Sequence, residues 1–377
     1  MPTPARQIVS TLNENGTMTI EVRESSIPDP AAKEVTVAIE AAPINPSDIA
    51  GLYGPAMLAD ADYTPGRIVA PVPAAAMKAQ AGRIGVPTVT GIECAGTVIA
   101  AGSDPEAQAL MGKRVACWPG AGTHASHVNV SLGACIAIPD SASIENSSAS
   151  FVNPMTALGF TGTMQRQGYK ALVHTASASN LGQMLNRICQ EDGIPIVNIV
   201  RKPEQVALLK NMGAKYALDS SLPDFDASLI DAIAECQAWC AFDAIGGGDT
   251  GGRILAAMER AATRNAEFSR YGSDQRKHLY VYGRLDLSPT ILPPSIGFSW
   301  DVSAWLLFPY LQEIGMQASR AMSERVIAGI DTTFASHFSQ RLSMEGVLQK
   351  DAALTIIARR TGEKALILPA YCVFRSS

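Results

Sequence analysis

The second half of the chain alternates strand-like and helical segments, and this alternation constrains the fold more than any other feature. Apolar runs suited to strands lie in residues 171–175, 194–200, 216–218, 241–245 and 278–282, and helical periodicity fills the stretches between them. Strands that are joined by helices form a parallel sheet with helices on its faces. We therefore expect an α/β domain with a doubly wound parallel sheet over residues 153–317.

The first 150 residues have a different character. Short runs with alternating polarity follow one another there, separated by turns, and no long amphipathic helix interrupts them. This pattern predicts a small β-barrel or sandwich. The last 60 residues return to a mixed style, with an alternating strand expected near 334–342, a helix near 346–359 and a final apolar strand at 365–368. We expect residues 318–377 to rejoin residues 1–152 in one domain.

Composition and charge exclude several classes of protein. The 377 residues are 47% hydrophobic and 17% charged, which is typical of a chain with large buried cores and excludes disorder. The net charge of -5 disfavours nucleic-acid binding. Neither a signal-like start nor an apolar window of membrane length is visible, so we expect a cytoplasmic protein without a membrane partner. The seven cysteines are scattered without a CxxC pair, which favours reduced thiols.

A run of small residues follows the strand at 171–175 and leads into a helix opened by Gly182. Small residues let the backbone approach a pyrophosphate, which is stabilised by amide groups and by the helix dipole. Only one glycine of the usual dinucleotide fingerprint remains, and the alternative is a strand-to-helix turn that binds nothing. The candidate pyrophosphate residues are Ser177, Ser179, Asn180, Leu181 and Gly182.

Two cations, Arg201 and Lys202, follow the strand at 194–200. An NAD-specific site places Asp or Glu near this position to bind the ribose hydroxyls. The two cations suit a 2′-phosphate instead, so the sequence predicts NADPH as the cofactor. Solvated charges at a strand end are the alternative interpretation.

Five segments resemble motifs of the medium-chain dehydrogenase/reductase superfamily, in its zinc-free quinone oxidoreductase and enoyl-thioester reductase branch. In chain order they are AAPINPSDI at 41–49, GIECAGTVIAAG at 91–102, NPMTA at 153–157, NIVR at 198–201 and TGEKALILP at 361–369. The resemblance covers nearly the whole chain. It implies a GroES-like β-barrel catalytic domain over 1–152 and 318–377, and a Rossmann NADPH-binding domain over 153–317.

The resemblance also implies further site residues. Asn45 and Thr156 match positions that flank the nicotinamide, and Gly246 follows the strand at 241–245 in the cofactor domain. Ser220 stands where quinone oxidoreductases often have a tyrosine near the 2′-phosphate. No metal is expected, because Asn45 and Ile92 occupy the positions of a cysteine and a histidine that bind zinc in related alcohol dehydrogenases.

Other residues of metal-binding types have ordinary explanations. His124 and His127 lie in a segment that resembles a structural strand, and we expect them to be structural. Cys236 and Cys240 are four residues apart without a further ligand nearby, which favours core packing.

Without a metal, hydride transfer needs an acceptor that conjugation already polarises, such as a quinone or an α,β-unsaturated carbonyl. A phenol suits the roles of hydrogen-bond donor and proton source. Tyr53, shortly after the NPSD motif, is the first candidate and Tyr63 is the second. Packing of a loop aromatic over the core is the alternative for both.

Three functions remain open. The first is an NADPH-dependent reductase of small quinone-like electrophiles, the second an enoyl-thioester (CoA or acyl-carrier) reductase, and the third a catalytically silent NADPH-binding regulatory homologue. An insertion at about 67–90, absent from typical quinone oxidoreductases, is expected to be a lid or an oligomer contact. The aromatic segment at 297–305 resembles a region that pairs across a two-fold axis in the family, which implies a homodimer.

Overall fold

The computed structural model describes residues 2–370, and the chain divides into two compact units. Met1–Val152 and Ser323–Ser377 form one of them, which we call the discontinuous unit. Asn153–Met322 forms the other, which we call the inserted unit. The predicted fold class, a β domain combined with a parallel α/β domain, is confirmed.

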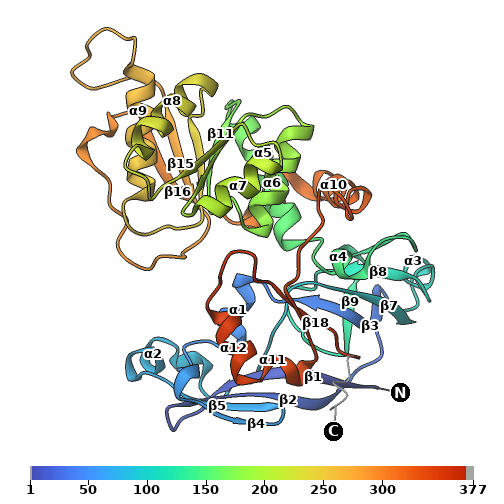
Figure 1. The fold of residues 1–377 in the computed structure, drawn as a ribbon. Coiled ribbons are helices and arrows are strands. Elements are labelled where there is room, and N and C mark those ends of the chain that lie inside the picture. The colour runs from blue at the N-terminus through green and yellow to red at the C-terminus, as the bar shows by residue number, and fades with distance from the viewer. Residues whose placement is uncertain (1, 371–377) are drawn as a thin grey trace. The chain divides into compact units, whose positions relative to one another are not determined.

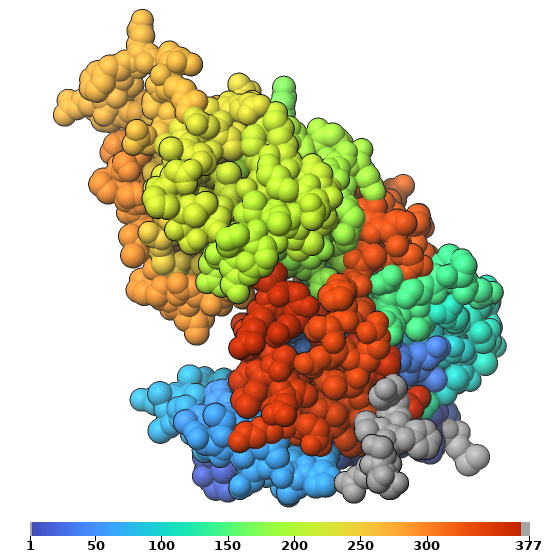
Figure 2. Space-filling view, in the orientation of Figure 1, coloured from blue at the N-terminus to red at the C-terminus, as the bar shows by residue number. Residues whose placement is uncertain are grey.

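Two sheets build the discontinuous unit. Within the described residues, one sheet has the order β4-β5-β2-β1-β6, and the other has the order β10-β8-β7-β3-β18-β17 with β9 also paired to β3. Figure 2 shows the C-terminal segment, in red, lying against N-terminal segments in blue. The strands are β1 (Thr3–Leu12), β2 (Thr17–Ile27), β3 (Glu34–Pro43), β4 (Asp62–Thr64), β5 (Arg67–Pro71), β6 (Thr88–Val89), β7 (Cys94–Ala101), β8 (Arg114–Cys117), β9 (His127–Ser131), β10 (Cys135–Ala137), β17 (Gln340–Leu342) and β18 (Ala365–Ile367).

Strand β3 is the centre of this unit, since it pairs with β7, β9 and β18. Its alternating residues Val35, Val37 and Ile39 are buried, as the sequence pattern predicts. Strand β18 pairs antiparallel with the end of β3, which joins the C-terminal segment to the first part of the chain. The expected strand at 334–342 is wrong in extent: only Gln340–Leu342 is a strand, and Phe334 and Phe338 are buried outside it.

Short helices connect these strands where the sequence predicted only turns. None of them exceeds eight residues, which is too short for a clear helical period in the sequence. The single helix expected at 346–359 is likewise two short helices. The helices are α1 (Pro46–Leu52), α2 (Ala74–Ala79), α3 (Pro105–Gln108), α4 (Ile144–Ser148), α11 (Met344–Val347) and α12 (Lys350–Ile357), with 3-10 turns η1 (Leu58–Asp60), η2 (Ala81–Arg83) and η3 (Leu132–Ala134).

The segment expected to be an insertion, residues 67–90, begins and ends as part of a sheet. Strand β5 pairs with β2 and β4, and β6 pairs with β1 at the other edge of the same sheet. Between them, α2 has no buried residue, and the Arg83 guanidinium lies 3.5 Å from the carbonyl oxygen of Gly51 in α1. The segment is therefore attached to the sheet and to α1.

A single parallel sheet forms the centre of the inserted unit. Within the described residues its order is β13-β12-β11-β14-β15-β16, and each neighbouring pair is parallel. The order of the strands reverses between β11 and β14, the kind of point at which open α/β sheets bind ligands. The strands are β11 (Leu172–Thr175), β12 (Ile196–Val200), β13 (Tyr216–Asp219), β14 (Cys240–Asp243), β15 (Lys277–Val281) and β16 (Trp300–Ala304).

Helices cover both faces of this sheet. Figure 1 shows α8 and α9 on one side and α5, α6 and α7 on the other. The first face is packed by Leu229, Ile254 and Leu255 against buried strand residues. Helix α10 is interrupted at Gly315, where φ is 81°, and no helix of the described chain is long and apolar enough to cross a membrane. The helices are α5 (Val152–Arg166), α6 (Asn180–Glu191), α7 (Pro203–Asn211), α8 (Phe225–Cys236), α9 (Thr250–Thr263) and α10 (Leu307–Ala328), with the 3-10 turn η4 (Pro294–Ile296).

Candidate functional site

The loop between β11 and α6 has the form of an anion site. Ser179 caps α6, and its hydroxyl accepts a hydrogen bond from the Gly182 N–H at 3.2 Å. Asn180 and Leu181 are the first two residues of the helix, and both are partly exposed. Ala176 adopts a left-handed conformation with φ 51°, which glycine adopts more readily than a residue with a Cβ. The loop therefore turns directly from the strand into the positive end of a helix.

Gly182 is required by close packing of this loop. A Cβ at this position would lie 2.2 Å from the carbonyl oxygen of Ser177, which is closer than any side chain allows. Ser177 is itself buried, and its hydroxyl donates to the carbonyl oxygen of His174 at 2.6 Å. The one glycine that remains in the motif is thus at the position where the helix approaches the loop backbone.

Arg201, Lys202 and Ser220 lie at one corner of the sheet. The Ser220 N–H donates to the carbonyl oxygen of Val200 at 2.8 Å, which brings the ends of β12 and β13 together. Arg201 and Lys202 are exposed, and Lys202 Nζ lies 3.8 Å from Glu204 Oε1. Asp219 at this corner was not considered in the sequence; its Oδ2 is buried without a hydrogen-bond partner. The corner therefore combines two exposed cations with one buried carboxylate.

Asp243 ties the loop after β14 to the end of β11. Its Oδ1 accepts from the Thr175 hydroxyl at 2.7 Å, and its Oδ2 accepts from the Gly246 N–H at 3.0 Å. Gly246 has φ 76°, and a Cβ there would lie 2.5 Å from the carbonyl oxygen of Gly283. Gly246 is therefore needed where the backbones of the loops that follow β14 and β15 approach each other closely. Asp243 was not singled out in the sequence, although it lies within the strand predicted at 241–245.

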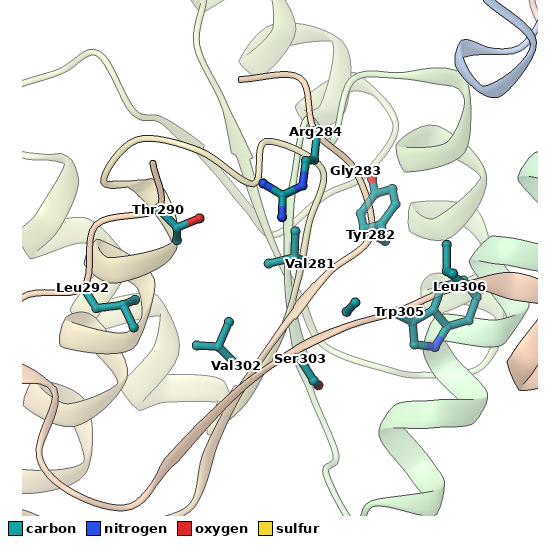
Figure 3. Close-up of a pocket in the computed structure, with 11 residues that line it drawn as sticks. Val281, Tyr282, Gly283, Arg284, Thr290, Leu292, Val302, Ser303, Trp305 and Leu306 are labelled. Atoms are coloured by element: carbon teal, nitrogen blue, oxygen red, sulfur yellow. The ribbon is translucent and has the colours of Figure 1, made fainter. Parts of the chain in front are cut away.

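A cavity of about 510 Å³ opens at the carboxyl ends of β15 and β16 (Figure 3). Its wall is mostly apolar, and Arg284 is its one charged residue. This is the side of a parallel sheet on which ligands bind. The cavity is lined by Val281, Tyr282, Gly283, Arg284, Thr290, Leu292, Val302, Ser303, Ala304, Trp305 and Leu306.

His174 connects the loop to the wall of this cavity. Its Nε2 lies 2.9 Å from the Tyr282 hydroxyl, and its Nδ1 lies 3.2 Å from the Ser177 hydroxyl. Burial lowers the pKa of His174 to about 3, so the ring is neutral near pH 7. The Ser177 hydroxyl donates its hydrogen to the His174 carbonyl oxygen, so it can only accept from the His174 ring. The neutral ring therefore donates from Nδ1–H to the Ser177 hydroxyl, and its Nε2 accepts from the Tyr282 hydroxyl. The sequence pattern gave no indication of this pair.

In the discontinuous unit, Asn45 lies at the start of α1 and is fully buried. Its Nδ2 donates to Glu93 Oε1 at 2.9 Å, and its backbone N–H donates to Asp48 Oδ2 at 2.8 Å. Glu93 Oε2 accepts from the backbone N–H groups of Phe151 and Val152 at 2.8 and 2.9 Å. Asn45 is thus held by its neighbours at both its backbone and its side chain.

Lys364, at the residue before β18, is buried beside this group, and its Nζ has no hydrogen-bond partner. Burial raises the pKa of Asp48 to about 6 and also raises that of Glu93, and in both cases the nearby Lys364 charge acts in the opposite direction. Burial lowers the pKa of Lys364, which the two carboxylates counteract. Glu93 and Lys364 were missed in the sequence, although both lie inside motifs on which the resemblance rests.

Both candidate tyrosines donate their hydroxyls to backbone carbonyls. Tyr53 is buried, and its hydroxyl lies 2.9 Å from the carbonyl oxygen of Val347. Burial raises the pKa of Tyr53 above its ordinary value. The Tyr63 hydroxyl lies 2.9 Å from the carbonyl oxygen of Leu58. Thr156, the other residue expected near the nicotinamide, is buried in α5.

His124 has partners on both ring nitrogens. Nδ1 lies 2.8 Å from the Thr90 hydroxyl, and Nε2 lies 3.2 Å from the carbonyl oxygen of Pro43. Burial lowers its pKa to about 4. These contacts support the structural interpretation of His124. No group of three or more His, Cys, Asp or Glu side chains in residues 2–370 is placed to hold a metal ion.

Comparisons with known proteins agree with this architecture. Residues 31–165 match the alcohol dehydrogenase GroES-like domain family. A solved structure from Mesorhizobium loti, provisionally named as an NADPH:quinone reductase, superimposes with a TM-score of 0.74 at 24% identity, covering 98% of this chain and 99% of that one. The chain thus carries the GroES-like domain of the alcohol dehydrogenase family over residues 31–165, and it shares the fold of this solved structure over nearly its whole length.

Two further proteins extend the comparison. The Escherichia coli quinone oxidoreductase, solved with NADPH, superimposes with a TM-score of 0.69 at 18% identity, covering 97% of this chain and all of that one. The mitochondrial enoyl-acyl-carrier-protein reductase of Rattus norvegicus is 26% identical over 227 residues, which cover 58% of this chain and 53% of that protein. The chain thus spans about half the length of the curated relatives it matches.

Proposed function

We propose that the chain is a zinc-independent, NADPH-dependent oxidoreductase that transfers hydride to a quinone or another conjugated carbonyl acceptor. The observation that carries the proposal is the β11–α6 loop, where Gly182 allows close backbone approach, together with the cations after β12. The two compact units would then correspond to the catalytic domain expected over 1–152 and 318–377 and the cofactor domain expected over 153–317.

The cofactor would be held by residues of the parallel sheet's carboxyl edge. The first turn of α6 would bind the pyrophosphate through Ser177, Ser179, Asn180, Leu181 and Gly182, since amide groups and the helix dipole favour an anion there. Arg201, Lys202 and Ser220 would bind the 2′-phosphate. Gly246 would shape the loop beside the nicotinamide, which Asn45 and Thr156 would flank. When bound, NADPH supplies the hydride.

The acceptor side of the proposal rests on the cavity at β15 and β16. Apolar side chains such as Val302 and Leu306 would hold a conjugated ring or chain, while the Arg284 guanidinium offers hydrogen-bond donors. Negative charge that develops on an acceptor oxygen is stabilised by donors of this kind. A cavity with a mostly apolar wall and few hydrogen-bond donors suits a small electrophilic substrate.

The proposed reaction also needs a group that donates a proton to the reduced acceptor. Tyr53 is the candidate from the sequence, but its burial and its hydrogen bond to Val347 support the packing role instead. Tyr63 also donates to a backbone carbonyl. A general acid must reach the substrate, so either tyrosine would first have to exchange its present acceptor for one on the substrate.

The test is direct measurement of cofactor affinity. We expect the dissociation constant of NADPH to be at least tenfold lower than that of NADH, and Arg201→Ala to remove most of this difference. Arg260→Ala, at an exposed arginine in the last turn of α9, is the matched control. Equal affinity for both cofactors, or an unchanged preference in Arg201→Ala, would contradict the assignment of the 2′-phosphate site.

The second candidate is an enoyl-thioester reductase, favoured by the similarity to the mitochondrial enoyl reductases. A comparison of turnover with a simple quinone and with a crotonyl thioester distinguishes the two. A chain that binds NADPH but turns over neither class would instead be a silent regulatory homologue.

We also propose that the chain is a cytoplasmic homodimer whose sheets join at β16. This strand is the last of its sheet, and Trp300, Val302 and Ala304 alternate as its exposed residues. An exposed edge of this kind is available for pairing with a second copy. Sedimentation of the wild type and of Val302→Lys tests this, since the charged variant should shift the dimer toward monomer.

A further inference from the structure

Four polar or charged residues are buried close to one another in the discontinuous unit. Asn45, Asp48, Glu93 and Lys364 are all buried, and all belong to the same unit. Their charged and polar side chains are withdrawn from water, and Lys364 Nζ has no hydrogen-bond partner. Because each such group is costly to bury, a native core retains it only for a specific reason.

We propose that Glu93 and Lys364 are positioning residues for hydride transfer, which hold Asn45 and the start of α5 in the arrangement that the cofactor requires. The proposal rests on the proposed NADPH-dependent function and adds two residues to its machinery. Neither residue is proposed to touch the substrate or the cofactor.

Glu93 makes contacts in two directions. Its Oε1 accepts from the side-chain amide of Asn45 at 2.9 Å. Its Oε2 accepts from the N–H groups of Phe151 and Val152 at 2.8 and 2.9 Å, and Val152 is the first residue of α5. Thr156 follows Val152 by about one helical turn. One carboxylate therefore binds both the Asn45 side chain and the first N–H of α5, the helix in which Thr156 lies.

All three contacts of Glu93 come from N–H donors, which favour the ionised carboxylate and counteract the burial that raises its pKa. A protonated carboxyl group would place a hydrogen against a donor, and a glutamine would place its NH₂ group against one. The carboxylate also lies at the N-terminus of a 15-residue helix, where negative charge is favoured.

Lys364 supplies the compensating positive charge. The residue is buried, and burial opposes the charge of both Lys364 and Glu93, while each favours the charge of the other. Its Nζ makes no hydrogen bond to either carboxylate and lies 5.6 Å from the centre of the Phe338 ring. Lys364 therefore acts through charge rather than through a fixed contact, and arginine at this position should serve better than an uncharged side chain of similar length.

The experiment compares Glu93→Gln, Lys364→Met and Lys364→Arg with the wild type. Glu14→Gln and Lys33→Met, at exposed positions of the same unit, are matched controls. For each we would measure kcat, the dissociation constant of NADPH, and the primary isotope effect with NADPH deuterated at C4. Far-ultraviolet circular dichroism at the assay temperature gives the folded fraction by which kcat is corrected.

We expect Glu93→Gln and Lys364→Met to lower kcat at least 30-fold and to raise the isotope effect, while the NADPH dissociation constant changes less than threefold. Lys364→Arg should recover most of the activity. A purely structural role predicts a lower melting temperature with an unchanged isotope effect and an unchanged kcat per folded molecule, and that result would overturn the proposal.

A double-mutant cycle with Asn45→Ala provides a second readout if one variant folds poorly. When Glu93 acts through Asn45, the effects of the two substitutions on kcat are strongly non-additive, whereas additive effects would count against the proposal. Failure of the proposed function is recognised separately: a wild-type chain that neither binds NADPH nor reduces any acceptor overturns both proposals, while an active wild type with active variants overturns only this one.

Discussion

Replacement of Tyr53 by phenylalanine distinguishes a catalytic phenol from a structural one. The Tyr53 hydroxyl donates to the carbonyl oxygen of Val347 at 2.9 Å, and both residues are buried. The substitution leaves this carbonyl without its donor while the ring remains in place. Loss of one partner from a buried hydrogen bond costs about 1–3 kcal/mol. For a unit of this size, that corresponds to a decrease of roughly 2–10 °C in the melting temperature.

We expect this destabilisation with kcat within about threefold of the wild type. Thermal unfolding followed by circular dichroism gives the first quantity, and steady-state turnover of a quinone at 20 °C gives the second. Tyr63→Phe is the matched control, because its hydroxyl also donates to a backbone carbonyl but the residue is only partly buried. A general acid contributes about 10²–10⁴-fold. A fall in kcat of that order with an unchanged melting temperature would refute the structural interpretation of Tyr53.

Three further predictions follow from buried contacts. Gly182→Ala should abolish measurable NADPH binding, because the added Cβ would lie 2.2 Å from the Ser177 carbonyl oxygen; calorimetric titration that shows unchanged affinity would contradict this. Lys277→Met should lower the free energy of unfolding by about 3–5 kcal/mol, since Glu259, 2.6 Å from the buried Lys277 ammonium, keeps its hydrogen bonds from Ser273 but loses its counter-charge, and urea denaturation measures this. His124 has its pKa lowered to about 4, so its stabilisation is complete above the unfolded value near 6.5 and is lost as pH falls toward 4. The wild type's advantage in unfolding free energy over His124→Asn should therefore shrink by about 2–3 kcal/mol between pH 7 and pH 4.5, and a constant difference would show that His124 does not titrate as described.

The sequence predicted the parallel sheet well because its strands are buried on both faces. Residues such as Val173, Val197 and Ala241 form continuous apolar runs between helices, and that pattern has few alternative explanations. The short helices of the discontinuous unit could not be predicted in this way, because α1 has only seven residues and α3 only four. The strand expected at 334–342 was overestimated because buried Phe334 and Phe338 imitate the alternation of a strand.

Local sequence motifs predicted candidate site residues. Contacts between segments that are far apart in the sequence could not be predicted in this way. The Gly182 loop and the cations Arg201 and Lys202 were named as candidates from the strand–helix order and from the residue types that follow the strands, and their role in cofactor binding stays a prediction. The partnership of Glu93 with Asn45 and the nearby charge of Lys364 depends on segments far apart in the sequence, and no spacing rule connects them. Tyr53 was predicted to be catalytic from its residue type and its position beside a motif. Its hydrogen bond to the Val347 carbonyl oxygen, which supports a packing role, is visible only in the folded chain.

The pairing of β18 with β3 has a consequence for synthesis on the ribosome. The first 152 residues leave the ribosome without β17, β18 and Lys364, so their sheet is incomplete while the inserted unit is already fully translated. Domains generally fold as units during synthesis. We therefore expect the inserted unit to fold first, and the buried carboxylates of Asp48 and Glu93 to lack their counter-charge until the last residues emerge. A chain truncated before residue 360 should retain the parallel sheet but expose an unpaired β3 edge, which makes its N-terminal part prone to aggregation.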